Sequence, residues 1–322
     1  MTEPSLKKPL LKPPPVAPGA RIAVVSPASS AQPDRITRGI AALRALGYDA
    51  VASEHAYGRH PPYFAGTVED RLADLHRAFA DPTVAAIMCT RGGYGSNYLL
   101  DGLDPDLIRA NPKPFFGYSD LTSMQNWLLD RIGLVSFHGP MTAADFYLEK
   151  GVHTESFQGA ITGGRIDVGP GQGMRLLRPG QARGTLYGGC LSILTAALGT
   201  QYAPQTEGKL LFIEDRNAQP YQIDRMLRHM ILAGKFEGVR GFIFGEMLDC
   251  ASPGADPGLL EGVIRRVLEP FGVPMAIGLR SGHVSQGNVT LPMGLDAELL
   301  LDKDQTLLHI LEPAVDTLHH AA

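Results

Sequence analysis

The stretch Phe115-Phe-Gly-Tyr-Ser-Asp-Leu-Thr122 places a serine between a short apolar run and the start of an amphipathic segment. This order predicts a strand that ends near Tyr118, a sharp turn at Ser119 and a helix over 120–131. At such a turn in hydrolases the serine stands exposed above the sheet, beside the free N–H groups of the helix N-terminus. The same pattern also fits a serine that only caps the helix, because serine is a preferred N-cap residue.

Upstream of this stretch, short apolar runs alternate with amphipathic segments. We expect strands and helices in alternation at 21–26, 33–46, 49–53, 67–80 and 84–90. Strands that alternate with helices are typical of parallel sheets covered on both faces. The sequence therefore predicts an α/β fold whose N-terminal domain, residues 20–150, has a doubly wound, flavodoxin-like parallel sheet and carries Ser119.

The remaining segments predict a tail, a connection and a second domain. Residues 1–19 are rich in proline and lack the apolar core of a signal peptide, so we expect a flexible tail. Residues 151–185 are rich in glycine and weakly periodic, which favours a connecting segment. Residues 186–322 again combine apolar strands with helices, and they predict a C-terminal α/β domain with β-rich, barrel-like character.

Composition limits the classes of partner. The 322 residues carry a formal net charge of −4 without a basic block, so no nucleic acid partner is expected. The apolar runs are shorter than the ~20 residues of a membrane-spanning helix. Cys89, Cys190 and Cys250 form neither a CxxC pair nor an even-numbered framework, which argues against a disulfide scaffold or structural zinc. We expect a cytoplasmic protein with no metal, no cofactor and no membrane contact.

A second glycine-rich turn, Thr90-Arg-Gly-Gly-Tyr-Gly95, also follows a predicted buried strand. Glycines at such a place let the backbone approach a ligand and direct N–H groups into a crevice. The turn lacks the G-x-G-x-x-G spacing of dinucleotide-binding folds, and no Walker lysine follows. A tight strand-to-helix turn and an anion-binding turn fit the pattern equally well.

A serine nucleophile requires a base, and two histidines are candidates. His283 ends the segment GLRSGH in a glycine-rich loop, and His138 follows another short apolar run. The base in turn needs an orienting carboxylate, and Glu214 follows the apolar strand 209–213 at the sheet edge where ligands bind in α/β folds. The alternatives are that His283 is an exposed loop residue and that Glu214 pairs with Arg216 at the surface.

Seven short motifs together resemble the LD-carboxypeptidases of peptidoglycan recycling and their relatives, the microcin-C immunity peptidases. In chain order they are VVSPAS (24–29), TRGGYG (90–95), GYSDLT (117–122), HGPM (138–141), GGCLSIL (188–194), FIED (212–215) and GLRSGH (278–283). This resemblance, which spans roughly residues 20–312, implies a serine peptidase with a triad of Ser119, Glu214 and His283. It also implies a homodimer.

The same resemblance assigns further site residues. It implies an oxyanion hole formed by the backbone N–H groups of Asp120 and Gly93, with Gly92 as a neighbouring candidate. Cys190 stands where the family commonly has asparagine, which changes the substrate contacts expected there. From residue type and placement, Arg91 or Arg280 is expected to hold a terminal carboxylate of the substrate.

The expected reaction is hydrolysis of the amide bond between an L-centre and a terminal D-amino acid, such as D-Ala, in peptidoglycan-derived tetrapeptides. One alternative is a microcin-immunity peptidase that cleaves peptidyl- or aminoacyl-nucleotides. It would need an aromatic platform, and Trp127 is expected in the core instead. The others are a non-catalytic two-domain binding protein and a metallo-hydrolase, for which the sequence offers no H-E-x-x-H spacing.

Overall fold

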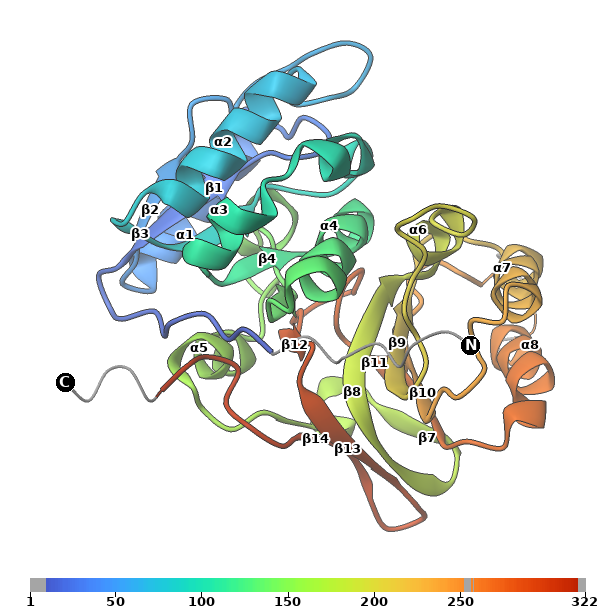
Figure 1. The fold of residues 1–322 in the computed structure, drawn as a ribbon. Coiled ribbons are helices and arrows are strands. Elements are labelled where there is room, and N and C mark those ends of the chain that lie inside the picture. Colours follow the sequence, from blue (N-terminus) through green and yellow to red (C-terminus); the bar gives the residue numbers. More distant parts are fainter. Residues whose placement is uncertain (1–9, 252–255, 257, 318–322) are drawn as a thin grey trace.

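The computed structural model describes residues 10–251, 256 and 258–317, which form two β-sheets flanked by helices (Figure 1). The first sheet has the strand order β12-β5-β4-β3-β1-β2. β1 to β5 are parallel, and β12 pairs antiparallel with β5 at the edge. The order 2-1-3-4-5 of the parallel strands is the flavodoxin-like order, so the predicted doubly wound sheet is confirmed. The strands are β1 (Arg21–Val25), β2 (Asp49–Ala52), β3 (Val84–Cys89), β4 (Phe115–Gly117), β5 (Ser136–His138) and β12 (Leu291–Met293).

The helices of the first sheet follow the predicted apolar periodicity. α1 buries Ile36, Ile40 and Leu43, which lie on one helical face. α2 begins at a capping box in which Thr67 and Asp70 satisfy each other's backbone N–H groups. The helix predicted over 120–131 is split into a 3₁₀ turn, an α segment and a π-helical end. These elements are α1 (Pro33–Ala45), α2 (Val68–Ala80), η1 (Ser96–Gly102), α3 (Pro105–Ala110), η2 (Ser119–Leu121), α4 (Thr122–Trp127), η3 (Leu128–Ile132) and η4 (Thr142–Phe146).

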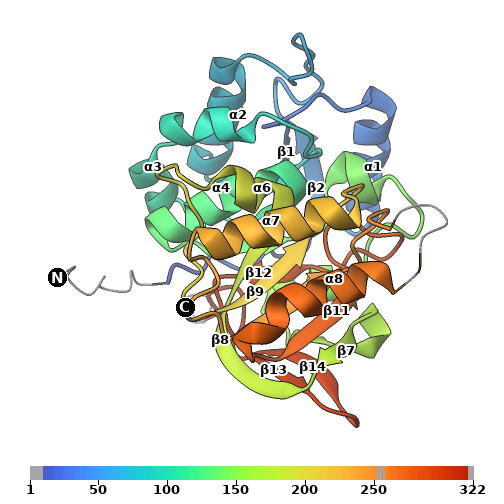
Figure 2. The same ribbon diagram turned by 90° about the vertical axis from the view of Figure 1, so that its right-hand side faces the viewer.

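The second sheet has eight strands in the order β6-β14-β13-β8-β9-β10-β11-β7. Its centre, β8 to β11, is parallel, and the outer pairings are antiparallel. Figure 2 shows α7 and α8 side by side across the sheet. The strands are β6 (Asp167–Val168), β7 (Arg175–Arg178), β8 (Gly180–Cys190), β9 (Lys209–Glu214), β10 (Gly241–Gly245), β11 (Met275–Leu279), β13 (Asp296–Leu301) and β14 (Thr306–Ile310). The helices are α5 (Thr154–Thr162), η5 (Pro170–Gln172), α6 (Leu191–Ala196), α7 (Pro220–Leu232), α8 (Leu259–Leu268) and η6 (Glu269–Phe271).

This second sheet must be strongly curled. Its two edge strands, β6 and β7, are consecutive in the chain and separated only by residues 169–174. Such a link spans at most roughly 25 Å, whereas a flat sheet of eight strands would be about 34 Å wide. The edges therefore approach each other, which gives the sheet the barrel-like character expected from the sequence.

Two segments differ from the sequence-based expectation. Residues 151–185, predicted to be a connection, contain α5, β6, β7 and the start of β8. Of the predicted tail, residues 1–9 lie outside the described residues, but Leu11 forms a backbone bridge to Leu134 and Val16 is buried. The segment 10–19 is thus packed onto the first sheet, because its apolar residues find partners there.

The two sheets share one hydrophobic cluster. It includes Phe116 and Phe137 from the first sheet and Leu210 and Phe212 from the second. β12 comes from the C-terminal part of the chain yet completes the first sheet, so the halves are interleaved. The carboxyl ends of β4, β9 and β11 consequently meet at one cavity, which is where Brändén-type crevices of α/β sheets lie. Within the described ranges, no helix is both long and apolar enough to cross a membrane.

Candidate active site

Ser119 lies at the turn between β4 and η2. Its φ is +63°, a left-handed value that is uncommon for a residue other than glycine and costs backbone strain. A side chain at Gly117 would place its Cβ 2.8 Å from the Cβ of Leu121, so only glycine fits this turn. The N-cap of η2 is Tyr118, and Ser119 Oγ makes no capping hydrogen bond in the described chain. The helix-cap interpretation of Ser119 therefore does not hold.

The glycine-rich turn packs directly on this serine. A Cβ added to Gly92 would lie 2.7 Å from the Cβ of Ser119 and 3.1 Å from the backbone N of Asp120. The next residue, Gly93, has a φ of +106°, which favours glycine. The N–H of Asp120 belongs to the first turn of η2, where backbone donors have no intrahelical acceptor. Predicted oxyanion donors and the serine are thus neighbours.

Buried polar contacts hold the glycine-rich turn in place. The guanidinium of Arg71, in α2, donates to the carbonyls of Pro27 and Gly95, each at 2.8 Å. The carboxylate of Asp120 accepts from the backbone N–H of Ser96 at 2.8 Å. Burial raises the pKa of Asp120 above its ordinary value. These contacts tie the turn to α2 and to η2.

Glu214 and His283 form a close pair. Glu214 Oε2 accepts hydrogen bonds from His283 Nδ1 at 2.7 Å and from its backbone N–H at 3.0 Å. The carboxylate is fully buried, and the imidazole is 17% exposed. Burial raises the pKa of Glu214, but the charge of His283 and these hydrogen bonds outweigh it, so this pKa is lowered. Burial lowers the pKa of His283, but the charge of Glu214 outweighs it, so this pKa is raised.

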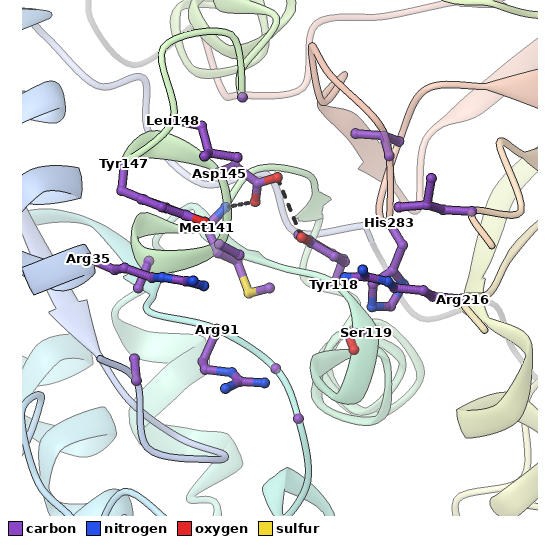
Figure 3. A pocket seen from close by; sticks show the side chains of 18 of the residues that line it. Arg35, Arg91, Tyr118, Ser119, Met141, Asp145, Tyr147, Leu148, Arg216 and His283 are labelled. Atoms are coloured by element: carbon purple, nitrogen blue, oxygen red, sulfur yellow. Dashed lines mark hydrogen bonds between the residues drawn. The ribbon is translucent and has the colours of Figure 1, made fainter. Parts of the chain in front are cut away.

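Ser119 and His283 line the same cavity, whose volume is about 410 Å³. Figure 3 shows both side chains on its wall. The ring of Tyr118, the residue before the serine, meets the His283 ring edge to face with centroids 5.1 Å apart. Ser119 Oγ makes no direct hydrogen bond to His283 in the described chain, and contacts of this kind often tighten only when substrate binds. The arrangement suits proton transfer from the serine to the imidazole.

His138, the competing base, does not line this cavity. Its side chain is fully buried, and its Nε2 lies 3.9 Å from Glu214 Oε1, on the carboxylate oxygen that does not contact His283. Burial lowers the pKa of His138 to about 4. A neutral, enclosed imidazole behind the carboxylate cannot take the proton of Ser119.

Three arginines surround the cavity in Figure 3: Arg35 from α1, Arg91 from the glycine-rich turn and Arg216 two residues after Glu214. Arg91 was expected from the sequence, whereas Arg35 and Arg216 were not. Arg280 lies elsewhere, because its Nη2 donates to the carbonyl of Gly171 at 2.6 Å and it is not among the lining residues. The expectation that Arg280 holds a substrate carboxylate therefore has no geometric support.

A polar bridge that the sequence did not suggest joins the serine turn to the histidine loop. Asp145 accepts hydrogen bonds from Tyr118 Oη at 3.4 Å and from Asn288 Nδ2 at 3.1 Å. Asn288 also accepts from the backbone N–H of Gly282 and donates to its carbonyl, each at 3.0 Å. Burial raises the pKa of Asp145 to about 6. The bridge fixes the residues that adjoin Ser119 and His283.

Cys190, Glu214 and His283 are the group near the cavity whose composition could suit a metal ion. Ligand atoms of the three lie within 4.8 Å of one another. Burial raises the pKa of the Cys190 thiol well above its ordinary value, which disfavours the thiolate that binds metals. Glu214 and His283 are already hydrogen-bonded to each other. The chemistry of this donor set fits a serine hydrolase pair better than a metal centre.

Comparison with protein families identifies both halves of the chain. The family model described as the LD-carboxypeptidase N-terminal domain matches residues 22–139, and the model for the C-terminal domain of the same enzymes matches residues 183–299. A relative from Bacillus subtilis, named "Probable murein peptide carboxypeptidase", is 36% identical over 288 residues, covering 87% of this chain and 89% of the relative.

Solved structures show the same fold. A MccF-like protein from Bacillus anthracis superposes with a TM-score of 0.84 at 30% identity, covering 93% of this chain and 99% of that one. A muramoyltetrapeptide carboxypeptidase from Oxalobacter formigenes gives a TM-score of 0.79 at 27% identity, covering 90% and 98%. The similarity thus extends over both sheets and the cavity between them.

Proposed function

Since the chain belongs to the LD-carboxypeptidase family, which consists of serine hydrolases, we propose that it releases a terminal D-amino acid from peptidoglycan-derived tetrapeptides. The bond cleaved joins an L-configured centre to that D-residue, such as D-Ala. The observation that carries the proposal is the Glu214–His283 pair, which shares a cavity with the strained Ser119. The names of relatives, which refer to murein peptides, support the substrate class.

In this mechanism His283 Nε2 takes the proton of Ser119 Oγ as the oxygen attacks the scissile carbonyl. The backbone N–H groups of Asp120 and Gly93 stabilise the oxyanion, with Gly92 beside them. His283 then gives its proton to the departing amine, the C–N bond breaks, and an acyl-enzyme remains. Water, deprotonated by His283, resolves that ester and restores the serine. Glu214 stays ionised throughout and stabilises the imidazolium.

The arginines of the cavity favour a substrate that ends in a carboxylate. Arg35, Arg91 and Arg216 place positive charge around Ser119, and a guanidinium binds a carboxylate through two parallel hydrogen bonds. A free terminal carboxylate is what distinguishes a carboxypeptidase substrate from an internal peptide bond. The cavity volume of about 410 Å³ lies within the usual range for small-ligand sites, about 300–1,000 Å³.

Mass spectrometry of a tetrapeptide stem tests this function. The wild-type protein should release D-Ala from the L,D-linked peptide. It should leave two matched peptides uncleaved, one ending in L-Ala and one whose terminal carboxylate is replaced by an amide. Ser119→Ala should reduce the rate on the order of 10⁴–10⁶-fold. Undiminished release by Ser119→Ala, or equal cleavage of the amide-capped peptide, would refute the proposal.

A microcin-immunity type of peptidase is the second candidate, because the MccF-like protein of B. anthracis shares the fold. The chemistry would be the same, with an aminoacyl- or peptidyl-nucleotide as substrate. Trp127 is buried in α4 and does not line the cavity, whereas Tyr147 does. Incubation with both substrate classes separates the candidates, and faster turnover of the nucleotide conjugate would favour the second.

Two further properties follow from the proposed role. Recycling of cell-wall peptides takes place inside the cell, so we propose that the protein acts in the cytoplasm, and cell fractionation tests this. The homodimer implied by the family resemblance is a proposal that light scattering of the purified protein tests directly.

A further inference from the structure

Two buried polar atoms beside the Glu214–His283 pair have no hydrogen-bond partner among the described residues. They are Oε1 of Glu214 and Nε2 of His138. They face each other at 3.9 Å, and both side chains are fully buried. A buried carboxylate oxygen without a donor is costly, and so is a buried ring nitrogen without a partner. Their position opposite each other suggests that each is the other's partner.

The second ring nitrogen of His138 decides which atom carries the proton. His138 Nδ1 lies 3.2 Å from Ser281 Oγ, and that hydroxyl has no other partner in the described chain, so its proton is available to Nδ1. Nε2 then carries the ring proton, and its N–H dipole points at the anionic oxygen of Glu214. The opposite tautomer would set a nitrogen lone pair against a carboxylate oxygen in a water-free space, which electrostatics disfavours.

We propose that His138 is a positioning residue for catalysis: its Nε2–H closes onto Glu214 Oε1 during turnover and holds the carboxylate that orients His283. The inference rests on the proposed function, since it assigns a role within the same site. Closing the gap to a hydrogen bond of about 2.9 Å requires a movement of roughly 1 Å.

The surroundings allow this movement. His138 is in β5, where it pairs with Gly117 of β4 and Leu291 of β12, so its backbone is fixed. Gly282 lies against both partners: an added Cβ would be 2.7 Å from Glu214 Cδ and 2.8 Å from His138 Cε1. Because this residue has no side chain, nothing holds the imidazole and the carboxylate apart.

A neutral donor suits this position better than a cation. Burial lowers the pKa of His138 to about 4, so the imidazole is uncharged near neutral pH. It can stabilise the Glu214 anion without cancelling the charge that attracts the His283 imidazolium. Other groups facing the pair contribute a constant background in the comparison below: they are Cys190, Asp215, Arg216, Tyr118 and Asp145.

The test compares His138→Phe with His138→Gln, which keeps an N–H donor near the Nε2 position. The readout is the pH dependence of Ser119 labelling by a fluorophosphonate, which needs no knowledge of the substrate. His138→Phe should slow labelling on the order of 10–100-fold, as expected for a lost hydrogen bond to a charged group. It should also move the acid limb to higher pH, because the deprotonated Glu214–His283 pair loses a stabilising donor. His138→Gln should retain most of the rate and an unshifted limb.

Equal losses in both variants with unmoved limbs would show that His138 acts only through packing, and the proposal would fall. Nitrogen NMR of the imidazoles gives an independent check: Nε2 of His138 should carry the proton in the wild type, and a protonated Nδ1 would overturn the proposal. If His138→Phe does not fold, Ser281→Ala should move the acid limb in the same direction. Failure of the tetrapeptide assay would leave the NMR result intact, so the two proposals fail separately.

Discussion

The chemistry of the candidate site depends on two residues whose pKa values are displaced in opposite directions. The pKa of Glu214 is lowered and that of His283 is raised, although burial alone would have done the reverse in each case. Each displacement is therefore produced by the other group, and the two titrate as a coupled pair. Strain at Ser119 and this ion pair are properties of single residues that the surrounding fold must maintain.

Activity should fall as the pH is lowered through the raised pKa of His283, because only the neutral imidazole can accept the serine proton. The acid limb of kcat/KM should thus lie above the ordinary histidine pKa of about 6.5. In Glu214→Gln the attraction is lost and burial remains, so the limb should move to lower pH while kcat falls on the order of 10⁴-fold. A limb that stays in place in Glu214→Gln would contradict the assignment of this carboxylate.

At the scale of elements, the site is built where a strand, a turn and a helix meet a second glycine-rich turn. β4 and η2 present Ser119, and the turn 91–95 covers it so closely that no side chain fits at Gly92. The long supporting contacts come from α2 through Arg71. Precision at the serine therefore depends on elements that never touch a substrate.

Gly92→Ala should abolish most activity without unfolding the protein. The added Cβ would lie 2.7 Å from that of Ser119 and must displace the nucleophile or the Asp120 N–H. A displacement of about 1 Å can reduce turnover on the order of 10²-fold. Gly262→Ala is the matched control, because Gly262 is in α8 with nothing within 4 Å, and alanine there should stabilise the helix by about 0.5–1 kcal/mol. Kinetics and thermal unfolding of both variants check this, and an active Gly92→Ala enzyme would contradict the close-packed turn.

At the scale of the whole molecule, the sequence predicted whatever had a regular period. The alternation of strands and helices before residue 138 was sufficient for the flavodoxin-like sheet, and residues at strand ends suggested Ser119, Glu214 and His283. The segment 151–185 was misread because β6 and β7 are too short for a period-2 pattern and lie among glycines. Nothing local indicates that β12 joins the first sheet, since that pairing depends on contacts far apart in the chain.

Site residues outside strand ends were equally hard to predict. Arg35 is an ordinary polar position of α1 in the sequence, and only the packing of α1 beside the turn brings it to the cavity. The position of Arg216, two residues after Glu214, was a signal that could have been used. His138 was noticed, but its place behind Glu214 follows from the antiparallel and parallel partners of β5, which no sequence window contains.

The most direct test of the account is to map the site of fluorophosphonate attack. Ser119 Oγ should form a bond to phosphorus as fluoride leaves and His283 takes the serine proton, so peptide mapping should find one adduct, on Ser119. The adduct should disappear in Ser119→Ala and form far more slowly in His283→Ala. A wild-type protein that hydrolyses the tetrapeptide yet carries no adduct on Ser119, or reacts equally fast without His283, would contradict the central claim.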